Sequence, residues 1–473
     1  MKFPPPKARE RGQYVGSPLD RTAELIERLI KDSSRVMVKK LAMNDWQWAV
    51  WNGDKGDWKS KQGGPLLPAL ARTSAFFPEL RPDPDRPHNR ATLVTVLWPT
   101  LGAIYESKFT WYSDKGDAEH HFTRNPRDEF QELSPASYLL IFKAKEESAP
   151  YQALTVDSAD EDLIEYITEI FRIDTSFQFQ IFESKEIDLG HHLSYLEEVI
   201  SQLIGKLKDG PQAFSAFVSS LERRRPFEIA GEAFAQWRHD TGNDRLNPYK
   251  IAAPGDVLYE LTRVREFNLY KQEEAKTYGA QLVRALLADR SSISAEAIIE
   301  ALVGRFEVFY DICKSAKQAR SSRAGGSFEV HMSSALQHGG IPYHPQFIFD
   351  GSKPDFVLPH GEIYADPEKR KTMAAILTLK TTLRERWRQV VSESTDAPIF
   401  LATLDENVPG STLNKLGEKG VTLVVPEAFK TSKYTEYQNN KNVLSYRQFF
   451  DHLDCTWQLH WLREGYDCFG VVA

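Results

Sequence analysis

The chain of 473 residues, 41% hydrophobic and 26% charged, has a globular composition and is too long for one small core, so we expect two domains. Its three cysteines show no zinc-ligand spacing. No stretch approaches the roughly 20 apolar residues of a membrane span, and no apolar signal region is seen at the N-terminus. We therefore expect a cytoplasmic protein that does not bind a membrane. The net charge of −7 argues mildly against nucleic-acid binding, although phosphate contacts depend on local Lys and Arg clusters.

The first part of the chain shows mostly β-type patterns. We predict a leader over residues 1–31, Pro-rich and then helical, followed by a mainly-β domain over 32–173. In that domain short apolar runs alternate with Gly, Pro, Asn and Asp, which break strands. Residues 174–221 are predicted to be a linker, with one helix at His192–Lys208 that Asp209-Gly210-Pro211 ends.

The pattern changes from residue 222 onward. Long helices are expected at Gly255–Leu286, Ser294–Ala319 and Ser327–Gln337, followed by short apolar runs that alternate with further helical segments. Strands that alternate with helices predict an α/β domain over 222–435, with a mixed sheet flanked by helices. Residues 436–473 are predicted to be a C-terminal extension.

One constellation in this second part suits the hydrolysis of a phosphodiester with the help of a metal. Asp355 opens the short strand Phe356-Val357-Leu358, Lys380 ends a second strand, and Glu393 follows on the next helix. Glu329 lies on the helix Ser327–Gln337 and could add a further acid. Carboxylates supply the hard oxygen ligands that Mg²⁺ needs, and a lysine stabilises developing charge. Taken singly, each residue also fits a structural role, as a turn residue or a solvated strand end.

A segment dense in hydrogen-bond donors follows Lys380. An Arg fork binds guanine O6 and N7, and a carboxylate accepts from cytosine N4. Arg384, Glu385 and Arg386 therefore have the groups needed to read adjacent G·C pairs. The alternative is a solvated helix face on which the arginines pair with the glutamate. Trp387 among the charges favours a helix with one packed face, which would fix the direction of the arginines.

Several short sequence motifs resemble, in the same order, those of the EcoRII family of type II restriction endonucleases. They are Ser322–Glu329, Lys353-Pro354-Asp355-Phe356, Leu379-Lys380-Thr381-Thr382, Arg386-Trp387-Arg388-Gln389, Glu393 and Gly420–Pro426. The resemblance implies a PD-(D/E)XK restriction-endonuclease-like fold, Mg²⁺-dependent double-strand cleavage and a homodimer. In the wider group that cuts CCGG-type sites, the second metal-binding carboxylate lies on the helix after the lysine strand, at Glu393 here. That group reads G·C pairs with a triplet matched by Arg384-Glu385-Arg386, and the weaker match Leu261–Phe267 implies a DNA contact by Arg263.

The N-terminal part resembles that family's effector domain more faintly. Val38–Asp45 and Phe122-Thr123-Arg124 look like pieces of its B3-like pseudobarrel, which binds a second DNA copy. On this basis Lys39, Lys40, Lys61 and Arg124 are expected to contact DNA, and a solvated face is the alternative. Trp46, Trp48, Trp51 and Trp58 crowd the first arm, where packing of a barrel is favoured over stacking on bases.

Together these observations predict a type II site-specific deoxyribonuclease that cuts double-stranded DNA at a near-palindromic CC(N/W)GG-like site. Asp355 and Glu393 would hold Mg²⁺, Lys380 would stabilise charge, and Glu329 would complete the acidic site. Two protomers would each cut one strand, and a cognate DNA methyltransferase is expected in the same system. A modification-dependent or repair nuclease of the same fold, and a non-catalytic DNA-binding protein with a decayed nuclease domain, are the alternatives.

Overall fold

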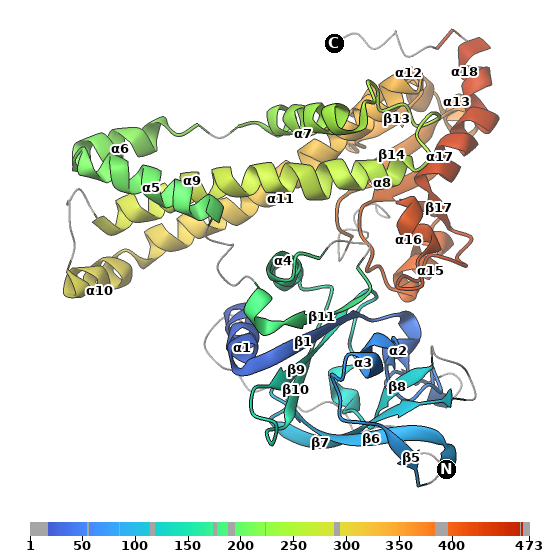
Figure 1. The fold of residues 1–473 in the computed structure, drawn as a ribbon. Coiled ribbons are helices and arrows are strands. Elements are labelled where there is room, and N and C mark those ends of the chain that lie inside the picture. Colours follow the sequence, from blue (N-terminus) through green and yellow to red (C-terminus); the bar gives the residue numbers. More distant parts are fainter. Residues whose placement is uncertain are drawn as a thin grey trace. The chain divides into compact units, whose positions relative to one another are not determined.

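A computed structural model describes residues 18–53, 56–84, 86–113, 119–173, 177–187, 194–222, 224–287, 294–383, 396–463 and 465–466. The chain divides into two compact units (Figure 1). Unit 1 comprises Met1–His192 with the short segments Glu406–Pro409 and Lys433–Glu436, and unit 2 comprises the remainder. In these ranges no helix is both long and apolar enough to cross a membrane.

Unit 1 is built mainly of strands. Its elements are α1 (Pro18–Asp32), β1 (Ser33–Lys40), α2 (Met43–Gln47), β2 (Trp51–Asn52), β3 (Asp57–Trp58), β4 (Leu66–Leu67), α3 (Leu70–Thr73), β5 (Arg81–Asp83), β6 (Arg86–Trp98), β7 (Ala103–Trp111), β8 (His120–Thr123), η2 (Arg127–Glu129), β9 (Tyr138–Ala144), β10 (Tyr151–Val156), α4 (Glu161–Ile170), β11 (Phe179–Glu183) and η3 (Ser184–Glu186). The described strands form a nine-stranded sheet in the order β11-β1-β9-β10-β6-β7-β8-β4, with β5 beside β6. The predicted mainly-β architecture is confirmed.

Side chains on both faces of this sheet are buried, because successive residues of a strand point to opposite faces. Met37 of β1 and Ile141 of β9 enter one core, which also holds Trp46 and Trp48. Val38 of β1 enters a second core on the other face. The packing interpretation of the first two tryptophans is therefore confirmed.

Helix α1 differs from the leader that we predicted. Its side chains Ile26, Leu29 and Ile30 are fully buried in the second core, beside strand residues of β1, β9 and β10. The apolar side chains of this helix recur every three or four residues and so form one face, which the sheet covers. The helix is thus part of unit 1. The predicted linker also contributes a strand, because β11 pairs antiparallel with β1.

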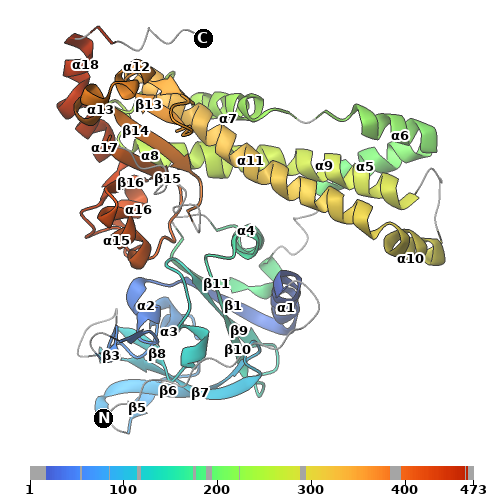
Figure 2. The same cartoon turned by 180° about the vertical axis from the view of Figure 1, so that it is seen from behind.

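Unit 2 combines a helical bundle with a second sheet. Its elements are α5 (Ser194–Lys208), α6 (Pro211–Ser220), α7 (Pro226–Thr241), α8 (Pro254–Tyr259), η5 (Glu260–Arg265), α9 (Glu266–Leu287), α10 (Ala295–Gly304), α11 (Phe306–His338), β12 (His344–Pro345), β13 (Phe356–Leu358), α12 (Gly361–Ala365), α13 (Pro367–Met373), β14 (Ala375–Lys380), β15 (Ile399–Thr403), α15 (Gly410–Glu418), β16 (Val421–Val425), α16 (Glu427–Thr431), β17 (Val443–Ser445), α17 (Tyr446–Leu453), η7 (Asp454–Gln458) and α18 (Leu459–Arg463). The long helices α9 and α11 lie side by side, and α10 lies at their end away from the sheet (Figures 1 and 2).

The sheet of unit 2 has six described strands in the order β12-β13-β14-β15-β16-β17. The pairs β12–β13 and β13–β14 are antiparallel, whereas β14–β15, β15–β16 and β16–β17 are parallel. The sheet is therefore mixed and flanked by helices, which confirms the predicted α/β class. The first of these strands is short, since only His344 and Pro345 pair with β13.

Helix α11 runs without a break through Gly325-Gly326, where we expected a new helix to open. A Cβ atom on Gly326 would lie 3.0 Å from the side chain of Pro226, the first residue of α7. The absence of a side chain lets the two helices approach closely, and this packing outweighs the low helix propensity of glycine. Conversely, the single helix expected at Ser294–Ala319 is divided at Arg305 between α10 and α11.

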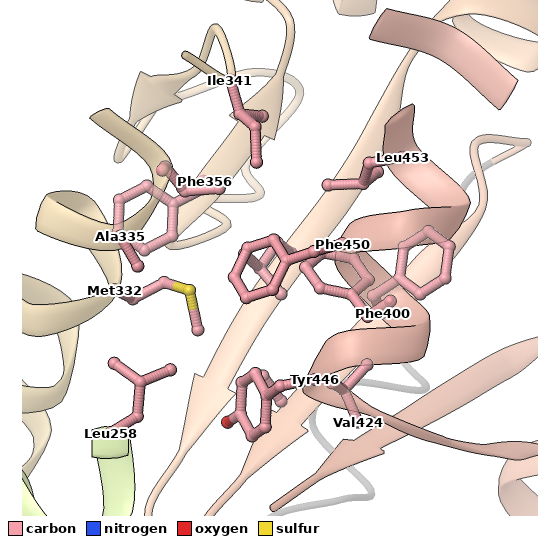
Figure 3. Close-up of a cluster of buried hydrophobic side chains, with 14 of the residues drawn as sticks. Leu258, Met332, Ala335, Ile341, Phe356, Phe400, Val424, Tyr446, Phe450 and Leu453 are labelled. Atoms are coloured by element: carbon pink, nitrogen blue, oxygen red, sulfur yellow. The ribbon is translucent and has the colours of Figure 1, made fainter. Parts of the chain in front are cut away.

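One core joins the bundle to the sheet. Figure 3 shows Leu258 of α8 and Met332 of α11 converging with Phe450 of α17 over the strands. The predicted C-terminal extension is part of this core, because β17 pairs with β16 and Trp457 and Trp461 are buried in it. Burial of such large apolar surfaces stabilises the fold, and the segment after 436 therefore belongs to unit 2.

Candidate active site

Strand alternation places three polar side chains together on the sheet of unit 2. Leu377 and Leu379 of β14 point into the core, so Thr378 and Lys380 point to the opposite face. Phe356 pairs with Leu377 in the antiparallel β13–β14 ladder and also points into the core. Asp355, directly before Phe356, therefore faces the same side as Thr378 and Lys380.

The carboxylate of Asp355 is held by the neighbouring strand. Its Oδ2 accepts hydrogen bonds from the hydroxyl of Thr378 at 3.0 Å and from the backbone N–H of Leu379 at 2.6 Å. Lys380 Nζ lies 3.9 Å from the same oxygen. In the described part of the chain no hydrogen bond reaches Oδ1, so this atom is available to a ligand. The structure thus brings Asp355 and Lys380 together.

Glu329 reaches the same place from helix α11. Burial raises the pKa of its carboxyl, and the negative charge of Asp355 raises it further, which places the two acids within electrostatic range of each other. A Gln346 side-chain N–H donates to Glu329 Oε2 at 3.0 Å, and the Gln346 backbone N–H donates to the carbonyl of Asp355 at 2.9 Å. Gln346 therefore contacts the carboxylate of Glu329 and the backbone of Asp355, and so links the two residues.

Sequence reasoning missed Gln346 and Thr378. Gln346 has a φ of 48°, in the left-handed region that a residue with a side chain seldom adopts. Strained backbone of this kind collects at functional sites, where the surrounding structure holds it. No pattern in the sequence predicts this backbone conformation at Gln346. Thr378 could have been found, because it lies two residues before Lys380 on the same strand and so shares its face.

The donor set fits a hard divalent cation. Asp355 and Glu329 supply carboxylate oxygens, the ligand type that Mg²⁺ prefers, and like charges held close together are stabilised when a cation binds between them. The described residues include no group of three His, Cys, Asp or Glu side chains that could hold a metal ion. The third carboxylate of our prediction, Glu393, lies outside the described residues.

The recognition triplet Arg384, Glu385 and Arg386 also lies outside the described residues. Arg263 is described and lies on the π-helical turn η5, partly exposed. Its neighbour Arg265 is engaged with Glu260 and Asp240. Within the described ranges Arg263 has no such partner, so its guanidinium is available to a ligand. A π-helical turn is itself frequent at functional sites.

The lysines proposed to contact DNA in unit 1 divide into two kinds. Lys39 is buried and pairs with Asp45 at 2.8 Å, and Lys40 is buried and pairs with Glu406 at 2.8 Å. Buried, paired ammonium groups fit a structural role and do not fit a surface that meets phosphates, so these two residues are a correction to the predicted contact set. Lys61 and Arg124 are exposed and remain candidates.

Comparison with known proteins identifies part of this unit. Residues 287–450, which include Glu329, Asp355 and Lys380, match the family model "EcoRII C terminal". The type II restriction enzyme EcoRII of Escherichia coli is 35% identical over 142 residues, which are 29% of this chain and 35% of EcoRII. The type II restriction enzyme SsoII of Shigella sonnei is 29% identical over 255 residues, which are 50% of this chain and 80% of SsoII.

Among solved structures, metal-depleted Ecl18kI in complex with uncleaved, modified DNA is similar, with 24% identity and a TM-score of 0.43. That similarity covers 56% of this chain and 87% of Ecl18kI. The family match and the mixed sheet together define unit 2 as a restriction-endonuclease-like α/β domain. Residues 287–450 thus match the family that the sequence was expected to resemble. The chain spans about a third of the length of EcoRII in this match.

Proposed function

We propose that the protein is a type II restriction endonuclease, a site-specific deoxyribonuclease that makes Mg²⁺-dependent double-strand cuts. The observation that carries this proposal is the joint position of Asp355, Lys380 and Glu329 within the segment that matches the EcoRII family. An acid held by its neighbouring strand, an ammonium group beside it and a second acid from a helix are the groups that phosphodiester hydrolysis requires.

Each residue has a distinct role in this proposal. Asp355 and Glu393 would hold the cation, which when bound polarises the phosphate and lowers the pKa of a water molecule. The ammonium of Lys380 lies beside Asp355, which would hold the cation. From this position Lys380 would stabilise the negative charge that develops on the phosphate oxygens. Glu329 completes the acidic site, and Gln346 and Thr378 hold the two described acids in place.

Sequence recognition is proposed to lie on the segment after Lys380. Arg384, Glu385 and Arg386 would read the outer G·C pairs of a CC(N/W)GG-like site, each good contact supplying about 1–3 kcal/mol of base discrimination. Arg263 would contact the same site from η5. A symmetric homodimer would place one catalytic site on each strand, and a cognate methyltransferase would protect the host DNA. Lys61 and Arg124 support a second DNA contact on unit 1.

Digestion of a sequenced plasmid tests the function directly. The purified full chain with Mg²⁺ is expected to give discrete fragments whose ends share one short near-palindromic sequence, and the same reaction with a chelator is expected to give none. The same plasmid methylated at that sequence is expected to resist. Cleavage of the methylated plasmid alone would favour a modification-dependent nuclease, and binding without cleavage would favour a non-catalytic DNA-binding protein.

A variant of Gln346 tests the bridge between the two acids. Gln346→Leu removes the side-chain N–H that Glu329 accepts and keeps a side chain of similar length. Because the contact is exposed to solvent, we expect a loss of about threefold to tenfold in the cleavage rate, which corresponds to the roughly 0.5–1.5 kcal/mol of an ordinary hydrogen bond. Single-turnover cleavage of the identified site measures the effect. An unchanged rate would remove Gln346 from the proposed site.

A further inference from the structure

A buried cluster between α9 and α11 has no part in the roles given above. It consists of Glu266 on α9 and of Arg323 and Ser327 on α11. All are buried, and the side chain of Glu266 has no exposed surface. The hydroxyl of Ser327 donates to Glu266 Oε1, and Arg323 Nη1 lies 3.3 Å from Glu266 Oε2. The guanidinium of Arg323 also stacks over the ring of Tyr270, 4.5 Å from its centroid.

Burial of this cluster is costly and therefore calls for an explanation. Burial raises the pKa of Glu266 to about 7, against the opposing effects of the Ser327 hydrogen bond and the Arg323 charge. Buried ion pairs are often no more stabilising than apolar residues of the same volume. They do fix geometry, because a charge removed from water tolerates little displacement of its partner. A role in positioning accounts for a cluster that stability alone does not favour.

The positions of the three residues along their helices relate them to the active site. Arg323 and Ser327 are four residues apart and so lie on one face of α11. Glu329 follows Ser327 by two residues, which turns it about 200° around the helix axis, toward Gln346 and Asp355. One face of α11 is thus held by Glu266 while the nearly opposite face carries the catalytic acid. Glu266 itself follows Arg263 by three residues along the chain.

We infer that Glu266, with Arg323 and Ser327, is a positioning group that sets the rotation and axial position of α11, and thereby the distance between Glu329 and Asp355. The same group holds the start of α9 and so the helical turn that carries Arg263. Gly326 is part of this arrangement, since its missing side chain allows Pro226 of α7 to approach. This inference rests on the proposed nuclease function.

The chain offers a matched control on the same two helices. Arg320 of α11 donates two hydrogen bonds to Glu274 of α9, at 3.2 and 2.7 Å. This pair links the helices as Glu266 and Arg323 do, but it lies more than two turns from Glu329 along α11 and is partly exposed. Loss of the Glu274 pair therefore loosens the bundle without direct effect on the helical turn of Glu329.

The experiment compares Glu266→Gln, Ser327→Ala and Glu274→Gln with the wild type, all as full chains. For each variant the thermal midpoint, the affinity for the duplex identified by plasmid digestion with the metal chelated, and the single-turnover cleavage rate at saturating duplex are measured. We expect Glu266→Gln to lower the cleavage rate about 10- to 100-fold, because an acid misplaced by about 1 Å loses that much. Ser327→Ala, which leaves the charge pair intact, is expected to lower it less, and affinity should change less than twofold in both.

Several outcomes separate positioning from general stability. If Glu274→Gln lowers the cleavage rate as much as Glu266→Gln, the effect belongs to the bundle as a whole and the inference is wrong. The same holds if both Glu266→Gln and Ser327→Ala cleave at the wild-type rate. If Glu266→Gln does not fold, a reduced rate of a folded Ser327→Ala variant still supports the inference, and a wild-type rate overturns it. If the wild type cuts no DNA, the proposed function fails first and the inference fails with it.

Discussion

Asp355→Asn is expected to lower the rate of DNA cleavage by at least about 10³-fold while the protein stays folded and still binds the duplex. The substitution keeps the size of the side chain and an oxygen that can accept from Leu379 and Thr378. It removes the negative charge that makes a carboxylate a strong ligand for a divalent cation. Loss of one charge-stabilising group at the reacting atoms typically costs about 10²–10³, and loss of a metal ligand adds to this.

The measurement is single-turnover cleavage with Mg²⁺, together with the affinity for the duplex and the thermal midpoint. Asp366→Asn is the control, because Asp366 caps α13 by accepting from the N–H groups of Glu368 and Lys369, a role that asparagine also fills. It should cleave as the wild type does. Cleavage by Asp355→Asn at more than a tenth of the wild-type rate would exclude Asp355 from metal binding.

Lys380→Met is expected to lower the cleavage rate by about 10²–10³-fold, the usual effect of removing one donor that stabilises transition-state charge. Methionine keeps an unbranched side chain of similar length at the end of β14, so the fold should not change. The ammonium group lies 3.9 Å from Asp355 Oδ2 and is partly exposed, which places it where a phosphate can approach. Single-turnover cleavage at saturating duplex measures the loss without a contribution from binding.

Lys371→Met provides the control for charge alone, because Lys371 is an exposed residue of α13 in the same unit. Weaker binding by both variants to the same degree, with no further loss of rate in Lys380→Met, would show that Lys380 acts only as a general phosphate contact. A role in charge stabilisation requires the loss to appear at saturating DNA.

The sequence placed Asp355 and Lys380 at the ends of two strands, and strand alternation explains why the structure brings them together. An apolar strand that ends in lysine and a second that begins with aspartate fix which residues face together once they pair, and Asp355 and Lys380 do. The fold class followed from the same patterns. The bounds of the long helices were less predictable, since the packing of Gly326 against Pro226 overrides a local preference that the chain alone would suggest.

Other features depend on contacts between residues distant in the sequence. Gln346 adopts a left-handed backbone conformation, in which it contacts Asp355 and Glu329. The residues adjacent to Gln346 in the sequence do not indicate this conformation. The sequence around Lys40 suggests a surface residue, but Lys40 is buried and pairs with Glu406, which lies 366 residues later in the sequence. Tryptophans 457 and 461 gave no signal of which core would cover them. In each case the partner, rather than the local pattern, decides the outcome.

The connection between β13 and β14 has a consequence for how related chains diverge. The two strands are antiparallel, and α12 and α13 lie in the connection between them. Residues gained or lost in that connection leave Asp355 and Lys380 facing each other, whereas one residue gained inside either strand would turn one of these two side chains into the apolar core. Relatives are therefore free to differ widely in the number of residues between these two positions, and a search that fixes this number would overlook them.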